Sequence, residues 1–231
     1  MKALSIEEPI AAFRQSVYQV FSECFLHPPS GKLLPFFQDP SWKQSASALF
    51  GLEIENLCAD LAEESDPNGL AVEHAALFVV PGPQQTFPFE TNYREKFSVD
   101  GASRPGRMLG QSTLQVQKIY LEWGMPADLE TNELADHAGV ELRFMSLLVA
   151  AERLSRDSPD EACTTGILQT EADFLNQHIL EWFPEWLHCV RERARRPFYR
   201  SAVTVLERFL ETEKLTLDQL VAAAAPGEKW R

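Results

Sequence analysis

The sequence has no apolar run long enough to cross a membrane. Its strictly apolar runs, such as residues 75–80, reach only six residues, whereas a transmembrane helix needs about 20. The N-terminus also lacks the apolar stretch of a signal peptide, because Glu7, Glu8 and Pro9 stand where that stretch would begin. We therefore expect the protein to stay in the cytoplasm.

Basic residues are scarce as well. The 231 residues include 21 Lys and Arg against 34 Asp and Glu, which gives a formal net charge of −13 at pH 7. A protein whose main partner is nucleic acid needs an excess of cations to neutralise phosphates. The charge balance therefore argues against nucleic acid and fits a basic partner, or solubility alone.

The sequence has no paired cysteine motif and no convincing strand pattern. The four cysteines lie far apart and form no Cys-x-x-Cys pair, so buried thiols are the simplest interpretation in a reducing compartment. No stretch alternates apolar and polar residues between hairpin turns. The single Asp-Gly pair, at residues 100–101, has no such alternation around it. We expect no strands.

Helical periodicity dominates instead. Residues 13–24, 140–151 and 198–209 share one apolar spacing of i, i+4, i+7, i+8 and i+11, which is typical of amphipathic helices facing a core. Further helices are expected at residues 52–64, 70–79, 109–123, 168–182, 184–195 and 215–225. The predicted fold class is therefore all-α.

Prolines divide this helical chain, because helices rarely continue through them. Pro28, Pro29, Pro35 and Pro40 predict a loop after the first helix. Pro126 ends the helix that carries Trp123, which makes residues 125–134 a hinge-like connector. We expect one helical domain over residues 1–231, with an N-terminal half at 1–124 and a C-terminal half at 135–231.

The most unusual polar cluster is residues 133–137, Glu-Leu-Ala-Asp-His. One interpretation is a helix start capped by Thr131 or Asn132, with acids in the first turn, where the helix dipole favours them. The other is a polar site at the mouth of a groove between the halves, where Glu133 and Asp136 pair with a cation. His137, near the positive helix end, would stay neutral.

A second cluster interleaves aromatic residues and proline over residues 87–93. Its rings either fold into the core or line an apolar peptide groove. The sequence leaves both interpretations open.

Motifs for catalysis and metal binding are incomplete. Residues 101–106 have the glycine spacing of a P-loop, but Arg107 and Met108 replace its Lys and its Ser or Thr. Glu185 and His188 form one Glu-x-x-His pair, whereas a di-iron bundle needs two such pairs and two more glutamates. We expect no enzyme activity, no bound metal and no cofactor.

Four segments in order carry a resemblance to a known family. Residues 77–83 are similar to its LF-x-GPG segment, with Val80 in place of Gly, and residues 88–93 to its P-[YW]-E-S-x-Y segment, with Phe and Thr substitutions. Residues 133–137 are similar to its E-P-x-D-H motif, with Leu134 in place of Pro, and residues 174–210 to its C-terminal helices. Over about residues 10–212, the chain resembles the TorD/DmsD family of cytoplasmic chaperones for molybdenum-containing redox enzymes, relatives of the NarJ-type assembly chaperones.

The resemblance implies a binding function. Family members recognise the twin-arginine leader of a partner enzyme and hold the apo form until its molybdopterin cofactor is inserted, before export. Transferred to this chain, it implies that a polar end pairs with the arginines and that an apolar wall takes the rest of the leader. The expected peptide-binding residues are Glu133, Asp136 and His137 at the polar end, Glu90 beside them, and Phe78, Phe89, Tyr93 and Trp123 in the wall.

Two other functions stay open. A nucleotide- or pterin-binding enzyme would use the loop at residues 101–106 as its cradle. A permanent structural subunit of a redox complex would stay with its enzyme after maturation. The oligomeric state also stays open, between a monomer and a dimer that exchanges domains through the connector.

Overall fold

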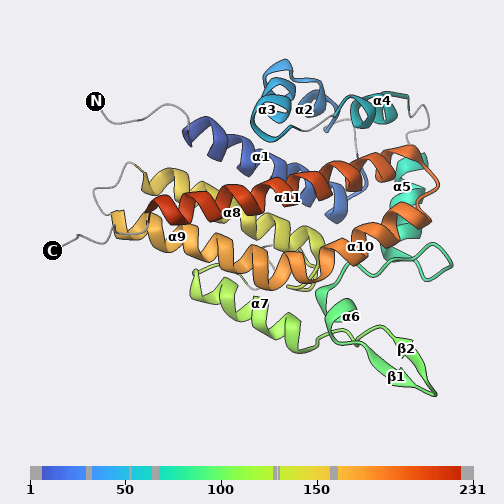
Figure 1. Ribbon diagram of the computed structural model, residues 1–231. Helices are drawn as coiled ribbons and strands as arrows, with labels where there is room; N and C mark the ends of the chain where they lie inside the picture. The colour runs from blue at the N-terminus through green and yellow to red at the C-terminus, as the bar shows by residue number, and fades with distance from the viewer. Residues whose placement is uncertain are drawn as a thin grey trace.

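A computed structural model describes residues 7–29, 33–51, 54–63, 68–126, 129, 131–156 and 161–224. Figure 1 shows an all-α fold with one small hairpin, which confirms the predicted fold class. The elements are α1 (Glu7–Leu26), α2 (Leu34–Gln38), α3 (Pro40–Phe50), α4 (Glu55–Glu63), α5 (Gly69–His74), α6 (Glu90–Arg94), β1 (Phe97–Val99), β2 (Ala102–Arg104), α7 (Gln111–Glu122), α8 (Ala138–Ser155), α9 (Glu161–Phe174), α10 (Leu180–Arg193) and α11 (Pro197–Ala224), with π-helical turns η1 (Ala75–Val79) and η2 (Leu175–Ile179).

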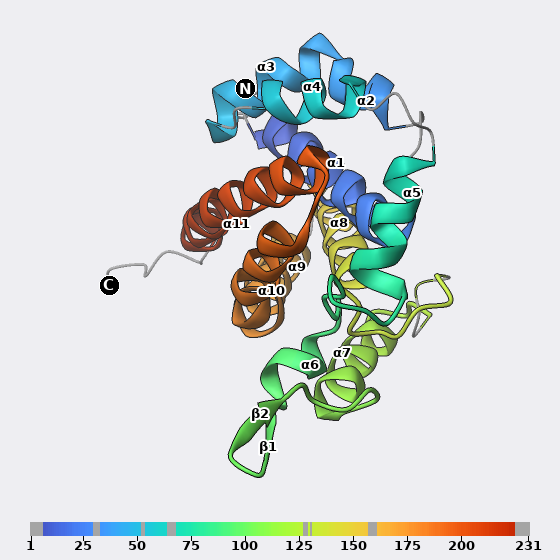
Figure 2. The ribbon, with the colours of Figure 1, turned by 90° about the vertical axis from the view of Figure 1, so that its right-hand side faces the viewer.

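The core lies between α1, α8, α9, α10 and α11, which Figure 2 shows gathered into one bundle. The three segments with the shared apolar spacing are α1, α8 and α11, so those predictions are confirmed. α1 and α8 pack closely where Ser22 donates to the Gly139 carbonyl at 2.7 Å. A Cβ at Gly139 would lie 2.6 Å from Leu26 Cγ, so glycine is what permits this approach.

Aromatic rings fill the bundle. Phe144 is fully buried with its ring 4.7 Å from Tyr120 and 4.8 Å from Phe174, and Phe209 is fully buried with its ring 5.1 Å from Tyr18. No helix in the described ranges is both long and apolar enough to cross a membrane.

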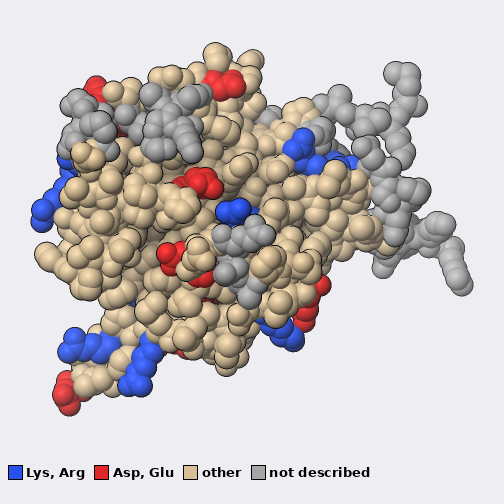
Figure 3. All heavy atoms as spheres, turned by 180° about the vertical axis from the view of Figure 1, so that it is seen from behind, with Lys and Arg blue, Asp and Glu red and all other residues tan. Residues whose placement is uncertain are grey.

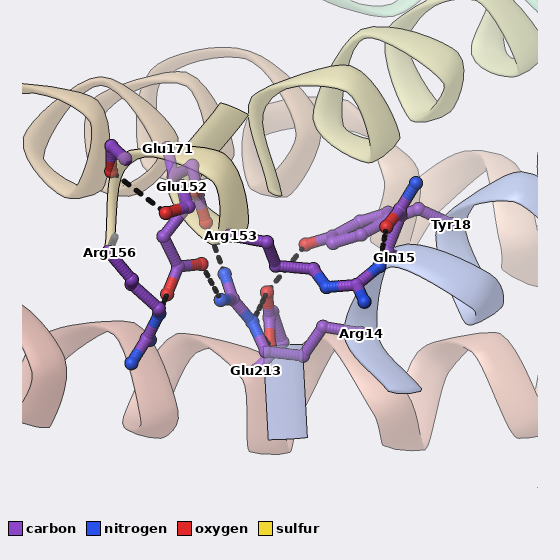
Figure 4. A network of polar contacts seen from close by, with 9 residues as sticks. Arg14, Gln15, Tyr18, Glu152, Arg153, Arg156, Glu171 and Glu213 are labelled. Atoms are coloured by element: carbon purple, nitrogen blue, oxygen red, sulfur yellow. Dashed lines mark hydrogen bonds and ion pairs between the residues drawn. The ribbon is translucent and has the colours of Figure 1, made fainter. Parts of the chain in front are cut away.

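A buried ionic cluster ties four helices of the bundle together. Arg14 of α1 donates to Glu152 of α8 at 2.6 Å, to Glu213 of α11 at 2.8 and 2.9 Å, and to Glu171 of α9. Figure 4 shows these carboxylates converging on the guanidinium, all with fully buried side chains. We call Arg14, Glu152, Glu171 and Glu213 the Arg14 cluster.

The run from α9 to α10 differs from the sequence prediction. We expected separate helices at 168–182 and 184–195, but the chain is continuously helical from α9 through η2 into α10. Pro184 lies inside α10. The separation was wrong because aromatic packing on both sides of the proline, at Trp182 and Trp186, holds the helix in place.

Two of the prolines after α1 also behave differently from the prediction. Pro28 and Pro29 lie in a non-helical segment after α1, as predicted. Pro35 is instead the second residue of α2, and Pro40 the first residue of α3. Proline suits a helix start because its fixed φ is already helical and its missing N–H would have no partner there. Asp39 caps α3 by accepting from the Ser41 N–H at 2.7 Å.

The prediction of no strands was wrong for one hairpin. β1 and β2 pair antiparallel, with Val99 opposite Ala102. The turn residues Asp100 and Gly101 both have positive φ, 52° and 78°, as a type I′ turn requires. All six strand residues are exposed. Because neither face of the hairpin is buried, its sequence does not alternate apolar and polar residues, and that alternation is the pattern that predicts a strand.

The division into two halves stays a prediction. α1, from the first half, packs against α8 of the second, so the halves share one core. Residues 127, 128 and 130 of the connector lie outside the described residues.

Candidate functional site

Two of the singled-out segments meet in a short backbone pairing. Phe89 and His137 form an antiparallel bridge. On either side of it, the Glu90 N–H donates to the Asp136 carbonyl at 3.0 Å, and the Ala138 N–H donates to the Pro88 carbonyl at 2.8 Å. The pairing brings residues about 45 positions apart in sequence into contact.

Asp136 faces inward from this pairing. Its side chain is buried, and Oδ2 accepts from the Thr91 N–H at 3.1 Å and from the Thr91 hydroxyl at 2.6 Å. The expectation that Asp136 lies at the mouth of a groove is therefore wrong. The start of α6 thus engages Oδ2, whereas Oδ1 is buried and has no hydrogen-bond partner among the described residues.

His137 caps α8. Its Nδ1 accepts from the Gly139 N–H at 3.0 Å, so the predicted caps Thr131 and Asn132 are wrong, and Glu133 and Asp136 precede the helix. Burial lowers the pKa of His137 to about 3. The ring is therefore neutral at physiological pH, as expected, chiefly because it is desolvated.

Glu90 is fully buried, and its ion-pair partner Arg94 is partly exposed at the surface. His178 Nδ1 lies 3.1 Å from both carboxylate oxygens, and the partly exposed Arg94 pairs with Oε1. Arg94 also donates to the Gln177 carbonyl at 2.9 Å. Glu90 thus connects α6 to the π-helical turn η2.

A third acid, Glu141 of α8, completes the group. Trp182 Nε1 donates to its Oε2 at 3.1 Å. Burial and the neighbouring Glu90 raise the pKa of Glu141 well above its usual range. We call Glu90, Asp136 and Glu141 the acidic seam.

The aromatic candidates divide into one core residue and three at the surface. Phe78 is buried against Phe25 and Trp186, with ring centroids 5.8 and 6.1 Å away, so its expected place in an open wall is wrong. Phe89, Tyr93 and Trp123 are each half-buried. Tyr93 stacks on Trp182 at 5.5 Å and Phe89 lies edge-on to His137 at 5.2 Å.

Glu133 is the one exposed carboxylate among the candidates. Sequence reasoning missed three exposed valines on α5 and η1, with exposed fractions of 67% for Val72, 62% for Val79 and 52% for Val80. Figure 3 views the molecule from behind, the side on which α5 lies, and charged side chains are sparse there. This face can take an apolar segment.

A groove of about 350 Å³ lies beside the acidic seam, between α6, α7 and η2. Arg94 and His178, both bonded to Glu90, line it together with Ile119 and Gln177. Sequence reasoning missed His178 as a member of the site. Its spacing of three residues from Leu175 predicted only that both lie on the same face of a helix.

The P-loop-like segment has a structural task. Gly106 is buried, its N–H donates to the Asn92 carbonyl at 3.2 Å, and the Asn92 amide donates to its carbonyl at 2.6 Å. A Cβ there would lie 2.0 Å from the Thr91 carbonyl oxygen. The glycine permits close packing on α6, and β2 occupies the start of the supposed phosphate loop.

The Glu-x-x-His pair is also on the surface. Glu185 accepts from Lys96 at 2.5 Å, and His188 is exposed. Within the described part of the chain, no group of three or more His, Cys, Asp or Glu is placed to hold a metal ion.

Comparison with known proteins gives the family. The nitrate reductase delta subunit family matches residues 43–188, more than half of the chain. The chain belongs to this family. Within it, chaperone protein TorD of Salmonella bongori is 25% identical over 231 residues, 96% of each chain.

Other members extend this relation. Chaperone protein TorD of Vibrio cholerae serotype O1 is 24% identical over 152 residues, 65% of this chain and 63% of that protein. The perchlorate reductase assembly chaperone protein of Dechloromonas aromatica is 26% identical over 130 residues, 53% of this chain and 55% of that protein. The predicted resemblance to the TorD family is confirmed, and these relatives are named chaperones rather than enzymes.

Proposed function

We propose that the protein is a cytoplasmic maturation chaperone for a molybdenum-containing redox enzyme. It binds the twin-arginine leader and the apo form of that enzyme and assists cofactor insertion and assembly before export. The observation that carries this proposal is the family match over residues 43–188, together with a TorD relative aligned over 96% of this chain. The chaperone itself carries no cofactor in this proposal.

The leader binds, in this proposal, along the surface beside the acidic seam. Exposed Glu133 pairs with a leader arginine through charge-assisted hydrogen bonds. Phe89, Tyr93 and Trp123 offer half-buried rings to the apolar stretch, and the exposed valines of α5 and η1 extend that surface.

The buried candidates act indirectly. Asp136, His137 and Glu90 hold the loop that carries Phe89 against the start of α8. Phe78 is packed in the core against Phe25 and Trp186. Their contribution to leader binding is to fix the shape of the surface rather than to contact the peptide.

The alternatives have less support. The packing of Gly106 against α6 removes the cradle that a nucleotide- or pterin-binding enzyme would need. A permanent structural subunit is separated by its behaviour after maturation. Size-exclusion chromatography of the protein with the apo and the loaded enzyme should show co-elution with the apo form alone, as a monomer or as a domain-exchanged dimer.

Calorimetric titration with a leader peptide tests the binding surface. The probe is the leader of the molybdoenzyme encoded nearest to this chain, with its arginine pair intact or changed to glutamine. Losing one charge-assisted contact costs about 1.5–3 kcal/mol, so Glu133→Gln should weaken binding at least tenfold. Glu211→Gln, an exposed change on α11, should bind as the parent does.

The four combinations of protein and peptide form a double-mutant cycle. If Glu133 contacts the arginines, the loss from Glu133→Gln and the loss from the changed peptide should not add. Full additivity would place the arginine contact elsewhere on the protein. Absence of binding to any twin-arginine leader would contradict the proposed function itself.

A further inference from the structure

A second groove lies on a different part of the molecule, where α4 packs on α11 (Figure 1). It has a volume of about 300 Å³. Leu57 of α4 and Val205 of α11 give it an apolar floor, and both are buried. None of its lining residues belongs to the acidic seam or to the proposed leader surface.

Hydrogen-bond donors line the rest of this groove. Arg200 and Thr204 lie one helical turn apart on α11, Arg191 comes from α10, and Asn56 comes from α4. A groove with an apolar floor and a few convergent polar groups is the usual form of a small-molecule site. Two guanidinium groups set its chemistry, because their planar donor forks match carboxylate and phosphate oxygens.

Arg191 carries a donor that the protein does not use. Its Nη2 pairs with Glu207 at 2.5 Å. Its Nε is shielded from water and has no hydrogen-bond partner among the described residues. A buried N–H without a partner is costly, and such groups are commonly completed by a bound molecule.

Arg200 has spare donors as well. It is exposed and donates to the Ala194 carbonyl at 3.1 Å, and within the described ranges no carboxylate pairs with it. The two acids that border the groove are already engaged, Glu207 by Arg191 and Asp60 by the Ser201 hydroxyl. Both guanidinium groups therefore retain capacity for an anion.

We infer that this groove binds an oxyanion group, a phosphate monoester or a carboxylate of a small molecule, between Arg191 and Arg200. The Arg191 and Arg200 guanidinium groups donate to the anion, and the Asn56 amide closes the α4 side. The site is independent of leader binding, because it shares no residue with that surface.

Titration calorimetry with inorganic phosphate and, separately, with succinate tests this inference on the full chain. Chloride keeps the ionic strength constant, because exposed charges are screened by salt. The parent should give saturable binding with at least one probe. Arg200→Gln should weaken that binding about tenfold or more, and the matched change Arg208→Gln, on an exposed α11 side chain outside the groove, should leave it unchanged.

A second variant tests the planar donor group of Arg191. Arg191→Lys keeps the positive charge near Glu207 but removes the guanidinium donors, so it should also weaken binding several-fold while the protein stays folded by circular dichroism. Saturation with phosphate alone identifies the phosphate source, and saturation with succinate identifies a carboxylate. The inference fails if neither probe saturates the parent, or if Arg208→Gln weakens binding as much as Arg200→Gln does.

Discussion

The Arg14 cluster and the acidic seam both bury several carboxyl groups, but they meet their cations in opposite ways. In the Arg14 cluster, the Arg14 guanidinium is as deeply buried as its three glutamates, and Arg156, whose side chain is 18% exposed, adds a second cation at Glu152. In the acidic seam, the cation is Arg94, whose side chain is 30% exposed at the edge of a groove. A cation inside the core, such as Arg14, fixes helices to one another. A cation at the margin, such as Arg94, links a buried acid to the surface, so a ligand bound at the groove can change the environment of Glu90.

The largest expected effect comes from removing the buried cation. Arg14→Met removes the fully buried cation and leaves Glu152 only Arg156 and Glu213 only the Tyr18 hydroxyl. Breaking a buried pair in this way costs about 3–5 kcal/mol. Chemical denaturation should show the free energy of unfolding reduced by that amount. Arg208→Met, on an exposed part of α11, should change it by less than about 0.5 kcal/mol, and equal losses would mean that the Arg14 cluster is not specifically stabilising.

Within the acidic seam, Asp136→Ala should cost less. The change leaves the buried Thr91 N–H and hydroxyl without their acceptor, which costs about 1–3 kcal/mol. Thermal melts and denaturant titrations should show this loss, whereas exposed Glu133→Ala should melt as the parent does. An unchanged stability for Asp136→Ala would mean that the carboxylate is available for a ligand after all.

The free energy of unfolding should depend on pH, because burial shifts the pKa of several acids and histidines. Burial raises the pKa of Glu171 to about 8, against a usual 4.5. An acid with a raised pKa in the folded state stabilises the protein at low pH and loses that contribution as the pH rises through its folded pKa. Burial lowers the pKa of His137 to about 3 and of His74 to about 4. These histidines act with the opposite sign, because they reduce stability as the pH falls below 6.5.

Between pH 6.5 and 8, therefore, these two histidines contribute little, and the buried acids of raised pKa, Glu171 of the Arg14 cluster and Glu141 of the acidic seam, should govern the pH dependence. The share of Glu171 is a fall in the free energy of unfolding of about 1–2 kcal/mol over this interval, since one pKa unit corresponds to about 1.4 kcal/mol. Glu171→Gln should reduce the slope by that share, and Glu211→Gln should leave it unchanged. A slope that Glu171→Gln does not reduce would assign the titration to another group, such as Glu213, whose pKa burial also raises.

The smallest effect is expected at an exposed pair of similar geometry. Lys96 and Glu185 approach to 2.5 Å, but their side chains are 37% and 53% exposed. Such pairs contribute about 0–1 kcal/mol. A double-mutant cycle with Lys96→Met and Glu185→Gln should give a coupling energy near 0 kcal/mol, at the lower end of about 0–1 kcal/mol. A coupling energy above about 2 kcal/mol would contradict the idea that burial makes the ion pairs of the Arg14 cluster stronger than this exposed pair.

Periodicity predicted the long helices because each buries one continuous apolar face. It did not predict how polar groups are placed, because the same residue pattern fits a surface cluster and a buried one. Asp136 illustrates this, since its acceptor role depends on Thr91, 45 residues earlier. Its burial follows from tertiary packing that no local pattern encodes.

One buried polar group did have a local signal. Arg14 and Tyr18 stand at i and i+4 on α1, in register with Phe21 and Phe25, and all four are buried. An arginine on an apolar helix face predicts buried acid partners. The sequence does not identify those partners, because Glu152, Glu171 and Glu213 lie on three other helices.

The Arg14 cluster also sets the order in which the chain can fold during its synthesis. Arg14 leaves the ribosome among the first residues, yet Glu213 follows 199 residues later. Glu152 and Glu171 follow Arg14 by 138 and 157 residues. At about 5–20 residues per second, the complete set of acid partners exists only on the order of 10–40 seconds after Arg14 is made. The native burial of this guanidinium is therefore completed only when nearly the whole chain has been synthesised.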